Sequence, residues 1–227
     1  TRVAPYCKYD IYGSKTGRLT TKKGSFPILT MNKEYRKILK PNNDWFVELD
    51  FNAAELRVML SLLDKAQPPE DLHLWNLKNI YKGVGDRQAA KERIFAWLYN
   101  SKSKDHTSNR FYDRGKIKDK YWDGDTIKTP FGRTIKSDEH HAINYLIQST
   151  CADNVMYQLI KLHKFLADKK SNIAFTIHDS VVIDLANEDR SSLMEMVKIF
   201  SNTKLGEYPA NISAGKNFGS MKRLNIT

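Results

Sequence analysis

Residues 45–64 read WFVELDFNAAELRVMLSLLD, and the pattern of apolar residues changes once along this stretch. The first seven residues, WFVELDF, form a mostly apolar run of the length of a β-strand. The following residues, AAELRVMLSLLD, repeat apolar side chains at helical spacing. We therefore expect a strand that runs directly into a helix, with Asn52 as the N-cap and Glu55 as its capping-box partner. Asp50 then lies at the end of the strand.

A second pair of apolar runs surrounds another acid. Residues 173–185 read IAFTIHDSVVIDL, which predicts two strands joined by a tight turn that contains Asp179. If these strands lie beside the strand of Asp50, the two carboxylates meet, and like charges repel unless a cation intervenes. Mg²⁺ takes oxygen ligands and commonly uses one or two carboxylates together with substrate phosphates. Spacing alone leaves open that each aspartate only ends a strand or begins a turn.

A cationic and aromatic stripe is predicted on the helix RQAAKERIFAWLY, residues 87–99. Arg87, Lys91, Phe95 and Tyr99 are four residues apart, so they share one face that drifts by about 40° at each step. A triphosphate fits the cationic end, which is also the positive end of the helix dipole, and a base and sugar fit the aromatic end. The stripe could equally be a solvated cationic face beside two core aromatics. We expect Asp86 to cap this helix, and Asn100, which tolerates the left-handed conformation, to close it.

The rest of the chain mixes strands and helices without regular alternation. We expect a short helix in residues 71–83, a polar loop at 101–110, a hairpin at 126–137, and helices at 139–169 and 187–202. Residues 138–141 (DEHH) resemble a metal cluster, but neighbouring helical residues point about 100° apart, so a solvated helix start is the better interpretation. This order predicts an α+β fold with an antiparallel sheet.

Composition limits the classes of protein that remain. The 227 residues carry 37 Lys+Arg and 26 Asp+Glu, a net charge of +11, which fits one domain or two small ones and a polyanionic partner such as nucleic acid. The two cysteines, Cys7 and Cys151, are far apart and indicate neither a disulfide framework nor a zinc site. The chain has no apolar run of membrane-spanning length and no signal stretch at its start. We therefore expect a protein without a membrane partner that is not secreted and that lies in the cytoplasm or another intracellular compartment, a virus-infected host cell included.

Six blocks of the sequence, in order, resemble the motifs of family A DNA polymerases, the group of bacterial DNA polymerase I and several phage replicative polymerases. Residues 50–57 (DFNAAELR) resemble D-Y-S-Q-I-E-L-R, the stripe of residues 87–99 resembles R-xxx-K-xxx-F/Y-xxx-Y-G, and residues 177–180 (IHDS) resemble V-H-D-E. Residues 16–20 (TGRLT), 71–73 (DLH) and 142–153 (AINYLIQSTCAD) are similar to T-G-R-L-S, D-I-H and A-I-N-x-x-I-Q-G-T-A-A-D. The resemblance covers nearly the whole chain.

The resemblance implies a template-directed DNA polymerase that adds deoxynucleotides to a primer 3′ end by two-metal nucleotidyl transfer. Asp50 and Asp179 would be catalytic and bind two Mg²⁺ ions, helped by the Phe51 carbonyl. The residues implied for the incoming deoxynucleoside triphosphate are Arg87, Lys91 and His73 on the phosphates, Phe95 on the sugar, and Tyr99 with Glu55 as the wall against a 2′-hydroxyl. Those implied for primer-template DNA are Arg18, Asn144, Gln148 and His178. In isolation, Glu55, Gln148 and His178 also have purely structural interpretations.

The resemblance also implies a domain plan. Residues 1–70 and 137–227 would form a palm with an antiparallel sheet, and residues 71–136 compact helical fingers. In the family the thumb and any exonuclease precede the TGR segment, so we expect both to be absent here. A separate chain or a missing N-terminal region would supply them.

The chain departs from the family pattern at four positions. Ser180 replaces a glutamate and removes an accessory carboxylate near the metals, Asn100 replaces a glycine, His140 an arginine, and Ala53 a glutamine. The HDS triplet instead resembles single-subunit RNA polymerases, which makes an RNA polymerase-like module one alternative, although Glu55 and Phe95 speak against it. The other alternative is a non-catalytic, basic nucleic-acid-binding fragment.

Overall fold

The computed structural model describes residues 6–224, which divide into two compact units. The sheet unit contains residues 6–51 and 152–224, and the helical unit contains residues 52–151. The longest helix, α6 (Glu139–Phe165), begins in the helical unit and ends in the sheet unit. Within residues 6–224 no helix combines the length and the apolar character that crossing a membrane requires.

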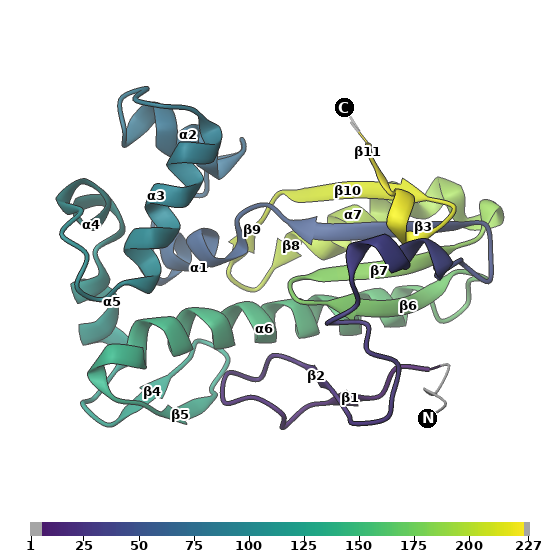
Figure 1. Ribbon diagram of the computed structural model, residues 1–227, viewed down its shortest axis with the longest axis horizontal. Helices are drawn as coiled ribbons and strands as arrows, with labels where there is room; N and C mark the ends of the chain where they lie inside the picture. The colour runs from purple at the N-terminus through teal and green to yellow at the C-terminus, as the bar shows by residue number, and fades with distance from the viewer. Residues whose placement is uncertain (1–5, 225–227) are drawn as a thin grey trace. The chain divides into compact units, whose positions relative to one another are not determined.

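The sheet unit is built on five antiparallel strands in the order β11-β10-β3-β7-β6 (Figure 1). Their bounds are Trp45–Phe51 (β3), Asn172–Ile177 (β6), Ser180–Leu185 (β7), Ala210–Gly215 (β10) and Lys222–Leu224 (β11). The two sequence stretches that predicted strands therefore supply β3, β6 and β7, and β3 pairs directly with β7.

The two faces of β3 have different surroundings because side chains alternate along a strand. Val47, Leu49 and Phe51 are buried, and the Phe51 ring stacks on Phe200 of α7 (Leu193–Ser201) at a centroid distance of 4.1 Å. The opposite face carries Phe46, Glu48 and Asp50. Its Phe46 end is covered by an apolar cluster that includes Ile28, Val182 and Phe218. The apolar cluster therefore leaves a polar end on the same face, and this end carries the acids.

Short elements complete the sheet unit. They are β1 (Tyr9–Asp10), β2 (Thr20–Thr21), β8 (Asn202–Thr203), β9 (Gly206–Glu207), and the 3-10 helices η1 (Lys33–Ile38), η2 (Asn187–Ser192) and η3 (Phe218–Ser220). Gln158 of α6 joins this helix to the end of α7, because its amide donates to the carbonyls of Phe200 at 3.0 Å and Asn202 at 2.9 Å. Tyr9 joins β1 to β6 by donating to the Thr176 carbonyl at 2.6 Å.

The helical unit consists of short helices and one hairpin. Its elements before α6 are α1 (Ala54–Leu62), α2 (Leu72–Asn79), α3 (Arg87–Tyr99), α4 (His106–Tyr112), α5 (Arg114–Tyr121), β4 (Thr126–Lys128) and β5 (Thr134–Lys136). Arg57 is fully buried in this unit and donates to the carbonyls of Asn52, Pro68 and Glu70 at 2.7, 2.8 and 2.9 Å. One buried guanidinium thus connects the start of α1 to the loop that leads into α2.

Most predicted elements are present, and the differences lie at their ends. The polar segment 101–110 is not only a loop, because α4 begins within it at His106 with Asp105 as its N-cap. Asn100 ends α3 with a φ of −104°, so it does not use the left-handed conformation. The predicted helix at 187–202 is divided into η2 and α7. The fold is α+β with an antiparallel sheet, as the sequence predicts.

Candidate active site

The pairing of β3 with β7 brings the two acids together in the sheet unit. Asp50 lies opposite Ser180 across the two strands. Asp179 immediately precedes Ser180 in the two-residue turn between β6 and β7, where Ile177 pairs with Ser180. The two aspartates are therefore neighbours across one strand pair, although 129 positions separate them in the sequence, 179 − 50.

The turn that carries Asp179 is fixed by its backbone and by two strand residues. His178 has a φ of 51°, in the left-handed region that histidine adopts more readily than most residues. Positive φ values in two-residue turns match the twist of the flanking strands. The Thr176 hydroxyl donates to the Ser180 carbonyl at 2.7 Å, which closes the base of the turn. Asp179 is thus held at a defined position.

The environment of Asp179 disfavours an isolated negative charge. Its Oδ1 atom is buried and accepts no hydrogen bond within residues 6–224. Burial raises the pKa of the Asp179 carboxyl, and the nearby charges of Arg18 and His178 act in the opposite direction. A buried carboxylate without a hydrogen bond is stabilised by a cation.

The donor set here fits a hard cation. Asp50 lies on the neighbouring strand and accepts a long hydrogen bond of 3.5 Å from the Asn211 amide. Phe51 ends β3 immediately after Asp50. In the described part of the chain, no three His, Cys, Asp or Glu side chains come close enough to hold one ion. Two carboxylates nevertheless suit Mg²⁺, which is usually bound by one or two carboxylates with water and substrate phosphates.

Two of the residues implied for DNA contact lie near each other in the sheet unit. Arg18 and His178 line the same small cavity, of about 20 Å³, together with Met156 of α6. The Ser14 hydroxyl donates to the Arg18 carbonyl at 2.8 Å, which orders the backbone before β2. The structure therefore places the TGR segment beside the turn that carries Asp179.

The predicted stripe lies on the outer face of α3 in the helical unit. Asp86 caps this helix as expected, by accepting from the Ala89 N–H at 2.8 Å. The inner face is buried through Ala90, Ile94, Trp97 and Leu98. Arg87, Lys91 and Tyr99 are exposed and Phe95 is half-buried. The Phe95 ring stacks with Tyr99 at 5.9 Å and lies 5.7 Å from the His73 ring. His73, which is buried, thus packs against the aromatic end of the stripe.

Asp71 contacts the cationic end of the stripe, and sequence reasoning assigned it no role. Arg87 donates to both of its oxygens, at 3.1 and 2.7 Å. Asp71 also caps α2 and accepts from the Asn52 amide at 2.9 Å. Burial acts to raise the pKa of Asp71, but the hydrogen bonds from Arg87, Asn52 and the Leu74 N–H hold it far below its usual range. The position of Asp71 before a short helix could have suggested an N-cap, but not its pairing with Arg87.

Glu55 contacts the end of the stripe instead of closing a capping box. The capping-box prediction is wrong, because Ala53 precedes α1 with a φ of 54° and forms no side-chain cap. Asn52 instead accepts from the Leu72 N–H at 3.1 Å. Glu55 is buried and accepts from the Tyr99 hydroxyl at 2.5 Å. The two residues implied for exclusion of a 2′-hydroxyl are therefore hydrogen-bonded to each other.

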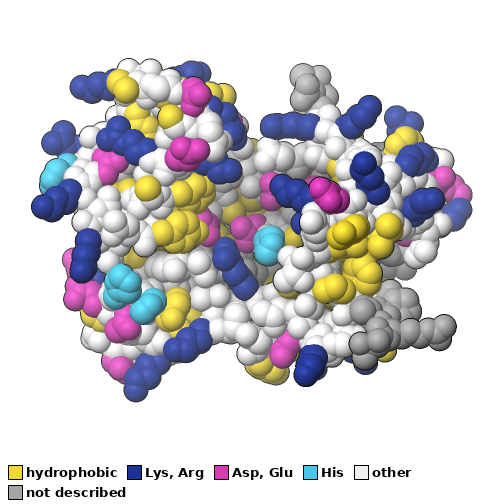
Figure 2. Space-filling model, in the orientation of Figure 1, with side chains coloured by type: hydrophobic (Ala, Val, Ile, Leu, Met, Phe, Trp, Pro, Cys, Tyr) yellow, Lys and Arg dark blue, Asp and Glu magenta, His cyan; other side chains and the backbone are white. Residues whose placement is uncertain are grey.

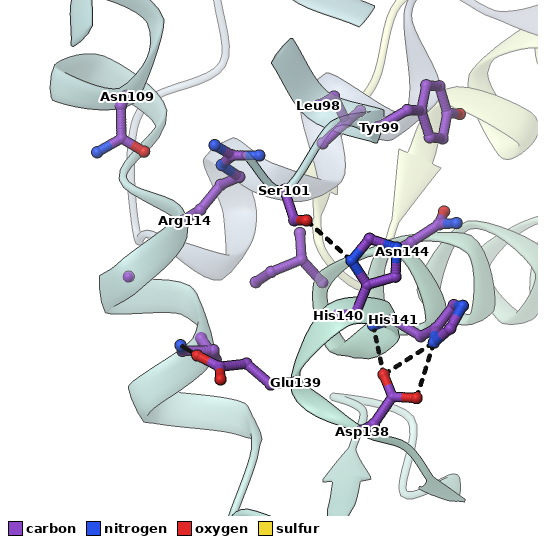
Figure 3. Close-up of a pocket in the computed structure, with 13 residues that line it drawn as sticks. Leu98, Tyr99, Ser101, Asn109, Arg114, Asp138, Glu139, His140, His141 and Asn144 are labelled. Carbon is purple, nitrogen blue, oxygen red and sulfur yellow. Dashed lines mark hydrogen bonds and ion pairs between the residues drawn. The ribbon is translucent and has the colours of Figure 1, made fainter. Parts of the chain in front are cut away.

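A cavity of about 610 Å³ opens in the helical unit beside Tyr99 (Figure 3). Asn144 and His140 project from the first turns of α6 toward it, and His140 Nδ1 lies 2.9 Å from the Ser101 hydroxyl. The Asn144 Oδ1 atom is buried and has no hydrogen-bond partner among residues 6–224. Gln148 is half-buried one turn further along α6. Asn144 thus lines the cavity and carries a buried acceptor without a partner among residues 6–224.

The DEHH segment forms the rim of the same cavity. Asp138 accepts from the His141 N–H at 2.9 Å and lies 2.8 Å from His141 Nδ1, which caps the start of α6. Its exposed helix start agrees with the interpretation from the sequence. Lys and Arg side chains are spread over the visible faces of both units (Figure 2), as the net charge of +11 leads one to expect.

A solved structure resembles the fold of this chain. It is the POL domain of Pol1 from M. smegmatis, in complex with DNA primer-template and dNTP, and its TM-score with this chain is 0.74. The chain has a DNA polymerase fold. The likeness covers 95% of this chain at 16% sequence identity, and the chain spans about half, 48%, of that polymerase domain. Searches of protein-family models and of curated proteins found no match.

Because His73 is buried, the stability of the chain should depend on pH. Burial and the nearby charges of Arg87 and Lys91 together lower the pKa of His73 to about 4, against the opposing effect of Asp71. In the unfolded chain His73 titrates near its ordinary value, about 6.5. As the pH falls below about 6.5, the unfolded chain therefore binds a proton that the folded chain resists until about pH 4, and stability decreases.

We expect thermal unfolding scans from pH 7.5 to 4.5 to show a larger loss of Tm for the wild type than for His73→Gln. The difference isolates His73 from the other acid-titrating groups, which both proteins share. Equal losses in the two proteins would contradict a neutral, buried His73.

Proposed function

We propose that this chain is a template-directed DNA polymerase module that adds deoxynucleotides to the 3′ end of a primer. The observation that carries the proposal is the strand pairing that sets Asp179, with its buried and unpartnered oxygen, beside Asp50. The polymerase fold supports the same conclusion independently. In this proposal residues 1–70 and 137–227 form the palm and residues 71–136 form the fingers, and family A is the group that the motifs resemble.

Asp50 and Asp179 would hold the metal ions, together with the Phe51 carbonyl. Two Mg²⁺ ions bound there would supply acidification of the attacking primer hydroxyl and charge neutralisation on the leaving pyrophosphate. The reaction forms a bond between the primer 3′-oxygen and the α-phosphate and breaks the bond from that phosphate to pyrophosphate. Placement of two acids on adjacent rigid strands suits this chemistry, because phosphoryl transfer depends mainly on positioning and charge.

The surface on α3 would hold the triphosphate. Lys91 is exposed on the same face as Arg87, and a phosphate can replace Asp71 as the partner of the Arg87 fork. His73, neutral at pH 7, can donate a hydrogen bond to a phosphate oxygen from its place beside the stripe. Phe95 would pack against the sugar. The reaction requires α3 to present this triphosphate to the metal pair when all substrates are bound.

DNA would be held by charge and by a few polar side chains. The net charge of +11 allows many phosphate contacts, whose strength falls steeply as salt rises. Asn144 and Gln148 on α6, with Arg18 and His178 in the sheet unit, would contact the primer and template near the growing end. Such contacts position the duplex, while base pairing with the template selects the nucleotide.

Asp50→Asn and Asp179→Asn test the metal-dependent step. Each change keeps the side-chain size and removes a negative charge, so we expect Mg²⁺-dependent primer extension to fall by about a thousandfold or more. DNA affinity, measured by fluorescence anisotropy at fixed salt, should stay equal or rise slightly because an anionic group is lost. Glu207→Gln, an exposed change in β9, is the matched control and should extend primers normally. A wild type that binds primer-template but never extends it would favour the non-catalytic binding module.

Glu55→Ala tests the choice of sugar and the RNA polymerase alternative. The hydrogen-bonded Glu55–Tyr99 pair would form the wall against a 2′-hydroxyl, so its removal should increase ribonucleotide incorporation relative to deoxynucleotide incorporation by about tenfold to a hundredfold. The measurement is single-nucleotide extension of one primer with dNTP and NTP in parallel. A wild type that already prefers ribonucleotides would instead support the alternative suggested by Ser180.

A further inference from the structure

Glu48 lies on the same face of the sheet as Asp50, two residues earlier on β3. Side chains alternate along a strand, so residues 48 and 50 share a face. The partners of Glu48 and Asp50 on β7 are Val182 and Ser180, and paired residues also share a face. Glu48 is half-buried there. A third carboxylate thus points to the side of the sheet that carries the proposed metal site.

A direct hydrogen bond connects Glu48 to the turn that carries Asp179. The Ser180 hydroxyl lies 3.0 Å from Glu48 Oε1 and 3.0 Å from the Ile177 carbonyl, and its single proton can go to either acceptor. Ser180 is buried, directly follows Asp179 and lies opposite Asp50. A change at Glu48 therefore alters the surroundings of Asp50 and Asp179 through its hydrogen bond with Ser180.

The charge of Glu48 has no cationic partner in the described chain. None of the ion pairs found within residues 6–224 involves Glu48. Three neighbouring acids on one half-buried face repel one another, and the buried Oδ1 of Asp179 adds a group that favours a cation. If Glu48 only held the two strands together, an uncharged acceptor for the Ser180 hydroxyl would be sufficient. The negative charge of Glu48 therefore requires another explanation.

We propose that Glu48 supplies the accessory negative charge of the metal site, from β3 instead of β7. The proposal rests on the proposed polymerase function. The motif that residues 177–180 resemble has glutamate where this chain has Ser180, and in this chain Ser180 is hydrogen-bonded to a glutamate from the neighbouring strand. Glu48 is a positioning residue and not a direct ligand, because no three acidic or histidine side chains within residues 6–224 converge closely enough on one ion. It acts by raising the local negative potential and by holding Ser180.

The test is a titration of the full chain with Mn²⁺ alone, in which electron paramagnetic resonance measures the free ion. Glu48→Gln keeps an acceptor for Ser180 and removes only the charge. We expect it to weaken Mn²⁺ binding by about 10- to 100-fold, the usual effect of losing a group that supports metal ligands. Glu207→Gln loses the same charge on another sheet and should bind Mn²⁺ as the wild type does.

If Glu48→Gln does not fold, two other variants test the proposal by removing the carboxylate from β3 and then placing one on β7. Glu48→Ser should lose Mn²⁺ affinity, and the double variant Glu48→Ser with Ser180→Glu, which moves the carboxylate back to β7, should regain most of it. A purely structural role of the Ser180–Glu48 contact predicts no such recovery. Failure of the double variant to bind more tightly than Glu48→Ser would overturn the proposal.

Parallel assays separate this inference from the proposed function. If the wild type extends primers and Asp50→Asn abolishes Mn²⁺ binding, while Glu48→Gln binds Mn²⁺ like the wild type, the role of Glu48 is wrong and the polymerase proposal stands. If the wild type neither extends primers nor binds Mn²⁺ in a manner that depends on Asp50, both proposals are wrong.

Discussion

The antiparallel register of β3 and β7 determines where Glu48, Asp50 and Asp179 lie relative to one another. Leu49 and Phe51 are buried on one face, and Phe51 stacks on Phe200. A slip of the register by one residue would move these side chains to the opposite face, at a cost of about 2 kcal/mol or more for each one exposed. The hydrophobic core therefore fixes the register, and the register fixes Asp50 opposite Ser180. The position of the acids is a consequence of packing on the other side of the sheet.

In the helical unit, buried polar contacts instead of strand pairing hold the cationic end of α3 in place. Arg57 is fully buried and satisfied by backbone carbonyls, and Asn52 accepts from the N–H of Leu72 at the start of α2. A buried guanidinium that lost these partners would be strongly destabilising, so the loop between α1 and α2 is tightly specified. This loop places Asp71, and Asp71 holds the Arg87 side chain in an extended, bidentate geometry. The cationic end of α3 is thereby preorganised for an anion of similar geometry.

The sequence predicted the parts that depend on local pattern. Strand length and helical spacing were sufficient for β3, β7 and α3, and the capping of α3 by Asp86 was also correct. Predictions from local pattern were wrong where a side chain bonds to a residue far away in the sequence instead of to a neighbouring one. Asn52 had the form of an N-cap, yet its oxygen bonds to Leu72, which lies 20 residues further on. The Arg87–Asp71 pair and the Ser180–Glu48 hydrogen bond also join separate segments, and spacing along one helix or strand contains no information about them.

The central claim is that Asp50 and Asp179 bind the same metal ions during nucleotide addition. The most direct measurement is anomalous diffraction from crystals of the chain with primer-template DNA, a non-hydrolysable deoxynucleotide and Mn²⁺. The account predicts anomalous peaks in contact with carboxylate oxygens of both aspartates, at about the 2.1 Å typical of small divalent cations. Peaks that contact neither aspartate, with substrates present in the crystal, would contradict it.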